Sequence, residues 1–97
     1  MAGYLIANIK VTDPEGFARY RAAVPEVIAR HGGRYLVRGG EMERLENAGG
    51  FNRVVVLEFP SLEAARAFYH SADYAPLLAM RTSSSESQVV LVEGYGG

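Results

Sequence analysis

The sequence contains no cysteine and no tryptophan, and it has no block of like charges. Without cysteine, the chain has neither a disulfide framework nor a thiolate nucleophile. Its formal net charge of −1 comes from 10 basic and 11 acidic residues that are spread along the chain. This balance gives no strong positive field to attract phosphate backbones or anionic lipids. We therefore expect no nucleic-acid partner and no membrane partner.

Long hydrophobic runs are absent as well. The apolar stretch at the start, MAGYLIANIKV, is too short to span a membrane, and no basic segment precedes it as in a signal peptide. Together with the absence of cysteine, this favours a cytoplasmic location. A chain of 97 residues has room for one hydrophobic core, so we expect a single domain over residues 1–97. Such a small core favours the burial of a further face against a partner.

Patterns that bind metals or cofactors are scarce. His31 and His70 are the only histidines, and they fall near the ends of two different predicted helices, so we expect no metal site. The glycines of residues 39–50 lack the strand-to-helix context and the lysine of a phosphate-binding loop, and we predict no cofactor. His70 is either a general base beside Tyr69 and Tyr74 or a polar residue that ends a helix, and the helix dipole favours the second interpretation.

The chain does contain an ordered succession of strand and helix patterns. Apolar residues at spacings of three and four after Pro14 predict a helix. Within it Pro25 removes one backbone hydrogen bond, which predicts a kink near Arg21 to Val24. Runs rich in β-branched and aromatic residues predict strands. In chain order we expect a strand (4–11), a helix (14–31) capped by Asp13, a strand (33–38), an exposed edge strand (41–46), a central strand (53–59), a helix (62–70) capped by Ser61, a helical stretch capped by Asp73, a serine-rich loop (82–87) and a last strand (88–93).

The main elements follow the order βαββαβ. This order is typical of the α+β ferredoxin-like fold, in which an antiparallel sheet carries the helices on one face. Alternation along the first strand sends Leu5, Ala7 and Ile9 to one face and Ile6 to the other, and both faces are largely apolar. The helices cover only one of them, so a second copy of the same sheet is the simplest cover for the other. We therefore expect a homodimer.

The face predicted to lie opposite the helices also carries a few polar groups. Asn8, Glu58 and Arg38 fall on it by strand alternation. Polar groups that converge within apolar walls are typical of a ligand pocket. A buried ion pair between Arg38 and Glu58 that binds nothing explains the same residues equally well, so both interpretations stay open.

The chemistry of the side chains suggests a role for several of the candidate site residues. Arg38 or Arg81 is suited to hold a substrate carboxylate or enolate, with Tyr20 and Tyr74 as the frame of the site. A desolvated Glu58 would have a raised pKa suited to proton transfer, which makes it the candidate catalytic residue. The predicted ligand-binding residues are Asn8, Tyr20, Arg38, Glu58, Tyr74 and Arg81.

Several segments together resemble a known family, the domain of unknown function 1330, within the dimeric α/β-barrel superfamily. They are GYLIANIKVTDPEGFARY, HGGRYLVRGG, VVVLEFPSLEAARAFYHSADY and VVLVEG, which cover nearly the whole chain. The resemblance implies a ferredoxin-like protomer whose sheet packs on that of a second copy, and it implies no reaction. The positions that it marks as a possible pocket are Asp13, Tyr20, Arg38, Gly39, Gly40, Glu58, Tyr74 and Arg81.

Two functional hypotheses follow. In the first, the protein is a small cofactor-independent enzyme that acts on an aromatic or carboxylated metabolite held between the sheet and the helices. In the second, it is a dimer that binds a small molecule or another protein without catalysis, and loss of the Glu58 carboxylate has little effect. A second titratable group beside Glu58 would favour the enzyme.

Overall fold

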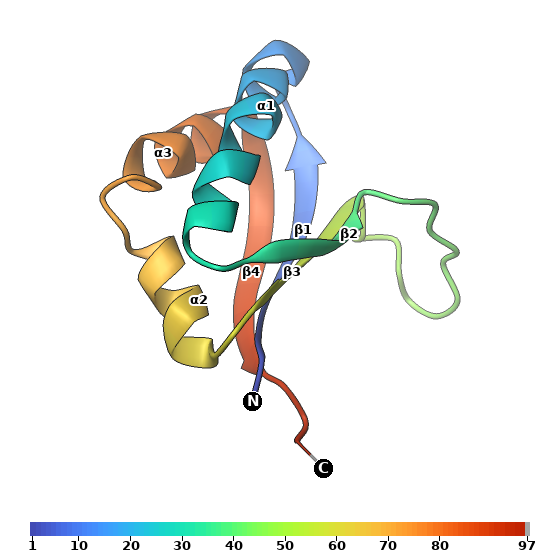
Figure 1. The fold of residues 1–97 in the computed structure, drawn as a ribbon. Coiled ribbons are helices and arrows are strands. Elements are labelled where there is room, and N and C mark those ends of the chain that lie inside the picture. The colour runs from blue at the N-terminus through green and yellow to red at the C-terminus, as the bar shows by residue number, and fades with distance from the viewer. Residues whose placement is uncertain (97) are drawn as a thin grey trace.

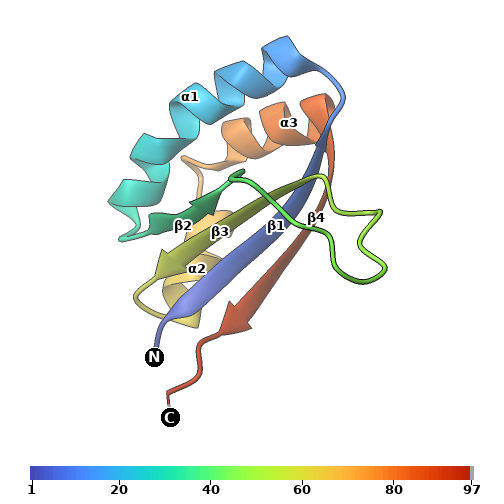
Figure 2. The same cartoon turned by 90° about the vertical axis from the view of Figure 1, so that its right-hand side faces the viewer.

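The computed structural model describes residues 1–96, which fold into a four-stranded antiparallel sheet with helices on one face only (Figures 1 and 2). The strand order is β2-β3-β1-β4, so β3 and β1 lie inside the sheet. The elements are β1 (Gly3–Val11), α1 (Pro14–Arg30), β2 (Arg34–Arg38), β3 (Arg53–Phe59), α2 (Leu62–Tyr69), α3 (Ala75–Ser84) and β4 (Ser85–Glu93). The predicted α+β ferredoxin-like arrangement, with its second helix split in two, is confirmed.

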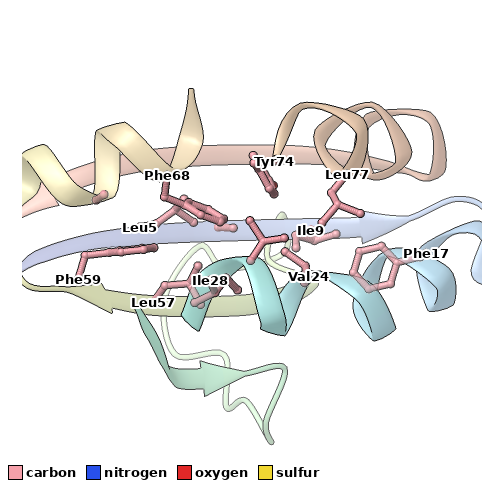
Figure 3. Packing of buried hydrophobic residues seen from close by; sticks show 13 residues of the cluster. Leu5, Ile9, Phe17, Val24, Ile28, Leu57, Phe59, Phe68, Tyr74 and Leu77 are labelled. Carbon is pink, nitrogen blue, oxygen red and sulfur yellow. The ribbon is translucent and has the colours of Figure 1, made fainter. Parts of the chain in front are cut away.

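The core lies between the sheet and the three helices, as Figure 3 shows. Strand alternation decides which side chains enter it. Leu5, Ala7 and Ile9 of β1 are buried, whereas Ile6 between them is 37% exposed on the opposite face. Phe59 from β3 and Phe68 from α2 meet at the centre, each 1% exposed, with their ring centroids 5.2 Å apart.

Helix α1 continues through Pro25 without a break. Because proline has no N–H, the carbonyl of Arg21 one turn earlier lacks its usual helical donor. Arg38, at the end of β2, supplies one: its Nη2 donates to the Arg21 carbonyl oxygen at 2.7 Å. The helix ends at Arg30 with His31 as its C-cap, and Gly32 beyond it has a φ of 77°, the left-handed conformation predicted for a glycine at this end. Asp13 occupies the N-cap position, but its side chain accepts no capping hydrogen bond.

Three local predictions were wrong. Residues 41–46 are not a strand, because Gly39 turns the chain and Arg44 closes the loop on itself through the carbonyls of Ala48 and Phe51. The serine-rich segment is not a loop, because α3 runs to Ser84 and β4 begins at Ser85. Serine hydroxyls there donate to carbonyls three or four residues earlier, such as that of Met80, which lets serine remain helical.

Asp73 is the third wrong prediction, since α3 begins after Tyr74 without a cap from the Asp73 side chain. The backbone N–H of Tyr74 donates instead to the hydroxyl of Ser71, at 3.2 Å. The Asp73 carboxylate lies against His31, at the end of α1, with 3.2 Å between Oδ1 and the ring Nε2. Asp73 was predicted to cap α3 because it lies just before that helix in the sequence. In the structure its carboxylate contacts His31 at the end of α1 instead.

The predicted cap at the start of α2 is confirmed, because the Ser61 hydroxyl accepts from the backbone N–H of Ala64 at 3.0 Å. We expect Ser61→Ala to lower the free energy of unfolding by about 1 kcal/mol, because an N–H at the helix start loses its partner. Chemical denaturation measures this change. Ser83→Ala is the control, since its exposed hydroxyl only bonds back to the Met80 carbonyl, and equal destabilisation of both variants would contradict the assignment.

Candidate functional site

A small cavity lies between the sheet and the helices, and we call it the inner cavity. Its volume is ≈ 40 Å³, enough for water or for the head group of a ligand. Its walls come from the core face of the sheet and from α1, and its polar groups come from residues on α1, β2, β3 and α3. The polar and aromatic lining residues are Phe17, Tyr20, Arg21, Tyr35, Arg38, Arg53, Tyr74 and Arg81.

A wider depression adjoins this cavity along α1, and we call it the outer groove. Its volume is ≈ 480 Å³, which is in the range of small-molecule sites. The two spaces adjoin at four side chains that line both of them, Phe17, Arg21, Arg38 and Arg53. The remaining walls of the groove are apolar and small: Val11, Pro14, Ala18 and Ala22.

Two tyrosines and an arginine form the polar end of the inner cavity. The hydroxyl oxygens of Tyr20 and Tyr74 lie 2.9 Å apart, and Arg81 Nε donates to the Tyr74 hydroxyl at 3.4 Å. Burial raises the pKa of Tyr20, and the neighbouring Tyr74 adds to the effect, so the Tyr20 phenol is neutral near pH 7. Arg81 is only 4% exposed and keeps its charge there.

Three further arginines gather where the cavity meets the groove. The Arg38 guanidinium lies over the Tyr35 ring, 4.6 Å from its centroid, and that of Arg53 lies 5.7 Å from the centroid of Phe17. Burial, followed by the charges of Arg21 and Arg38, lowers the pKa of Arg53. The site is therefore strongly cationic and has apolar and aromatic walls.

Arg38 lies on the helix side of the sheet, which corrects its predicted place. The pairing of β2 with β3 shifts between Tyr35 and Val37, so Leu36 has no partner of its own in the register. One extra residue moves every later side chain to the other face. Arg38 is thus opposite Val55, a residue that lines the inner cavity, and it contacts α1.

Glu58 and Asn8 lie on the opposite face, as the alternation predicts. The predicted partner of Glu58 was wrong, because Arg34 and not Arg38 holds it, with Nε and Oε1 2.8 Å apart. The hydrogen bond from Arg34 lowers the pKa of Glu58, and that from Tyr4 adds to it, so the expected raised pKa is wrong too. Asn8 binds the loop of residues 39–52 through the carbonyl of Gly50.

The structure thus separates the predicted site residues into two groups. Tyr20, Arg38, Tyr74 and Arg81 line the inner cavity, whereas Asn8 and Glu58 do not. Sequence reasoning missed Arg53, although it begins a strand in phase with the half-buried Val55 and the buried Leu57 and Phe59. An arginine in phase with buried residues was the signal that could have found it. Of the other candidates, His70 is exposed and stacks edge-on against Tyr69.

The face of the sheet opposite the helices, here called the open face, has an apolar row across its middle. Ile6 pairs with Val56 of β3 and with Val90 of β4, so the three side chains form a row across the sheet. Val90 is 55% exposed and Val92 is 45% exposed. The loop of residues 39–52 projects beyond the sheet on this side (Figure 1). Water covers this surface in the single protomer, which is an unfavourable arrangement for so much apolar area.

No group of His, Asp or Glu side chains within residues 1–96 is placed to hold a metal ion. The helices of the same part of the chain are too short or too polar to cross a membrane. Among the ion pairs of the described residues, one involves a histidine: His31, at the end of α1, binds Asp73.

This pair predicts a pH effect on stability. The Ser71 hydroxyl and then His31 lower the pKa of Asp73 from its ordinary 3.8 to about 2. Between these two values the unfolded chain binds more protons than the folded one, so stability present above pH 3.8 is lost as the pH falls towards 2. We expect Asp73→Asn to flatten this part of the stability curve, measured by urea denaturation at each pH. Asp13→Asn should leave it unchanged, and an unchanged slope in Asp73→Asn would contradict the assignment.

The arrangement of sheet and helices is that of dimeric ferredoxin-like proteins. A protein from Jannaschia sp. CCS1, described as a dimeric ferredoxin-like protein of unknown function, superposes with a TM-score of 0.71 at 13% identity, over 97% of this chain and 100% of that one. The family model described as domain of unknown function (DUF1330) matches residues 2–95. The chain belongs to this family, as its resemblance implied.

Two further solved structures share the fold. RPA0582 from Rhodopseudomonas palustris, a protein of unknown function, has a TM-score of 0.76 at 16% identity, over 99% of this chain and 84% of that one. SnoaB from Streptomyces nogalater, a cofactor-independent oxygenase, has a TM-score of 0.65 at 15% identity, over 99% of this chain and 95% of that one. Identities this low establish the fold and not the activity. No match was found among curated proteins.

Proposed function

We propose that this protein binds a small organic molecule between its sheet and its helices, and that it does so as a homodimer. The observation that carries the proposal is the polar end of the inner cavity. Arg81 and Tyr74 are buried and Tyr20 is half-buried, and all three lie against apolar walls. Burying a charge in such a place is costly unless a polar partner or a ligand compensates it. A few polar groups within such walls are the usual composition of a ligand site.

The volumes indicate how a ligand would lie. The inner cavity holds only a head group, and the body of a metabolite needs the outer groove, which adjoins it at Phe17, Arg21, Arg38 and Arg53. The polar end would then contact the tyrosine hydroxyls and Arg81. The rest of the ligand would lie along α1.

Catalysis without a cofactor is one form of this proposal. The resemblance to SnoaB concerns the fold, so support has to come from the residues themselves. Glu58, the predicted base, lies on the open face with a lowered pKa, which leaves the phenols of Tyr20, Tyr35 and Tyr74, beside the arginines, as the titratable groups that line the cavity. A neutral phenol there is suited to donate a hydrogen bond to a developing oxyanion. The alternative is a non-catalytic binding dimer.

The homodimer is supported by the open face. Its row of Ile6, Val56 and Val90 is apolar and partly exposed, and a second copy offers the same surface in return. Dimers of this kind match identical patches across a two-fold axis, which needs no partner of different chemistry. The dimeric relative from Jannaschia supports the same arrangement.

The ligand proposal is tested by what the protein retains on purification. The native protein is denatured, and the released small molecules are identified by mass spectrometry, for the wild type and for Tyr74→Phe. We expect a molecule enriched in the wild type and depleted in Tyr74→Phe, because that variant loses the hydroxyl between Tyr20 and Arg81. Tyr95→Phe is the matched control, since Tyr95 is 96% exposed.

The same molecule then distinguishes the two forms of the proposal. If its mass changes over time only in the presence of the protein, the protein is an enzyme. If it is bound and recovered unchanged, the protein is a binding dimer. Should the wild type release no more small molecule than Tyr74→Phe, the ligand proposal would be wrong.

A further inference from the structure

We propose that the ligand of this site is an organic carboxylate, and that Arg53, with Arg38 and Arg21, binds its acid group where the outer groove meets the inner cavity. This inference rests on the proposed function and names its ligand class. It assigns a binding role to Arg53, which sequence patterns did not single out.

The first observation is a cluster of cations without counterions. Arg21, Arg38, Arg53 and Arg81 all line the inner cavity, and no acidic residue lines either the cavity or the groove. Within residues 1–96 the ion pairs of the protein lie elsewhere and use Lys10, Arg30, His31 and Arg34. Like charges held together in an apolar setting are unfavourable, and an anion relieves the repulsion.

The second observation is an unpartnered donor. Arg53 Nε is buried and has no hydrogen-bond partner within the described residues, although its Nη2 donates weakly to the Arg38 carbonyl at 3.5 Å. A buried donor without a partner costs free energy, and most such groups in native proteins are satisfied. The guanidinium group presents its N–H groups as a planar fork that matches the two oxygens of a carboxylate. A bound acid group would satisfy Nε.

The backbone beside Arg53 is fitted to its guanidinium group. Gly39 has a φ of 68°, and a Cβ atom at this position would overlap the Arg53 guanidinium. Phe17 lies against the same group on another side. Glycine is favoured here by its positive φ, and the missing side chain leaves room for the guanidinium group to lie against the backbone. Such a fit fixes the place of the charge before any ligand arrives, which lowers the entropy cost of binding.

The apolar walls of the outer groove favour one class of anion over another. Val11, Pro14, Ala18 and Ala22 give the outer groove an apolar surface beside the arginines. A free inorganic phosphate would leave this surface unused. An aliphatic or aromatic carboxylate covers it while its acid group lies on the arginine fork, so the combination of walls and charge favours an organic acid.

The test compares acids with their neutral amides. Benzoate, phenylacetate and hexanoate are titrated against the protein by calorimetry, beside benzamide, phenylacetamide and hexanamide, which have nearly the same shape and no charge. We expect at least one acid to bind more tightly than its amide. We also expect Arg53→Met to weaken binding of that acid by about ten- to a hundredfold, the effect of losing a charge-assisted hydrogen bond.

Arg19→Met is the matched control. It removes the same charge from an exposed position of α1 that lines neither space, so we expect the affinity for the acid to stay within about twofold of wild type, because only a screened surface charge is lost. A second readout does not depend on the choice of acid. Without ligand, Arg53→Met should unfold at a higher temperature than the wild type, because it removes an uncompensated charge from the cluster.

The outcomes separate this inference from the function on which it rests. If amides bind as tightly as acids and Tyr74→Phe weakens both, the site binds small molecules but the carboxylate assignment is wrong. Tighter binding of inorganic phosphate than of any acid, or equal binding of an acid by Arg53→Met and the wild type, also overturns the assignment. If no acid and no amide binds and the purified protein carries no small molecule, both proposals are wrong.

Discussion

Phe68→Ala is expected to lower the free energy of unfolding by about 3–5 kcal/mol, the range for truncating a fully buried phenylalanine. Phe68 is 1% exposed, and its ring contacts that of Tyr74 at a centroid distance of 4.4 Å and that of Phe59 at 5.2 Å. Figure 3 shows it between the helices and the sheet. Since only a small part of the space can be refilled by its neighbours, the loss combines burial, aromatic contacts and a cavity.

Urea denaturation followed by circular dichroism measures this change. Phe51→Ala is the matched control, because Phe51 is 46% exposed in the loop of residues 39–52. Truncation at an exposed position usually changes stability by no more than about 0.5 kcal/mol. If the two variants unfold at the same urea concentration, the packing described for the core is wrong. If Phe68→Ala remains folded, it should also bind ligand less well, since Phe68 supports the Tyr74 ring.

Much of this fold follows from local patterns in the sequence. The alternation along β1 predicts its two faces, and the spacing of Phe17, Val24 and Ile28 predicts the buried stripe of α1. The Ser61 cap follows from a rule that involves four residues. These features can be predicted from the sequence because each depends on residues that lie close together in the chain.

Two of the predictions that were wrong concern features that depend on distant parts of the chain. Asp73 is satisfied by His31, which is 42 residues away, and this contact replaces the cap expected from local sequence. Residues 41–46 alternate as a strand does, yet β3 already pairs with β2 on one side and with β1 on the other, so it has no free edge for them once Gly39 has turned the chain. Alternation indicates which faces a strand would have and not whether a partner exists.

The candidate site contains both kinds of feature, those that local sequence predicts and those that depend on the rest of the fold. The residue types at Tyr20, Tyr74 and Arg81 could be selected from the sequence, and the fold brings them together at one end of the inner cavity. The bulge at Leu36 moves Arg38 to the helix side of the sheet. The strand sequence RYLVR contains no turn residue from which this bulge could be predicted. A one-residue irregularity therefore decides whether the site has Glu58 or Arg53 beside Arg38.

Arg38 also links the fold to the site. Its guanidinium donates to the Arg21 carbonyl that Pro25 leaves without a helical donor. It thereby holds α1 over the edge strand β2 and fixes a cation between the cavity and the groove. Pro25 removes one helical hydrogen bond, and the Arg21 carbonyl oxygen that it leaves free accepts from Arg38 and orients this side chain.

Ile6→Glu is expected to weaken homodimer association by about a thousandfold, because like charges facing each other across an interface cost several kcal/mol and each 1.4 kcal/mol is tenfold in affinity. Ile6 lies at the middle of the open face, in register with Val56 and Val90, and a two-fold axis would place two new carboxylates in the same interface. In the free protomer Ile6 is already 37% exposed, so the carboxylate can reach water and the fold should persist.

Sedimentation equilibrium measures the association, and circular dichroism checks that the variant is folded. Ala67→Glu is the control, since it adds the same charge to an exposed position of α2 on the side of the sheet that the helices cover, and it should remain dimeric. A monomeric wild type, or an Ile6→Glu variant as dimeric as the control, would show that the open face is not the interface. Because the cavity lies on the other side of the sheet, a folded monomeric Ile6→Glu that still binds the ligand would also show that assembly and binding are separate properties of the two faces.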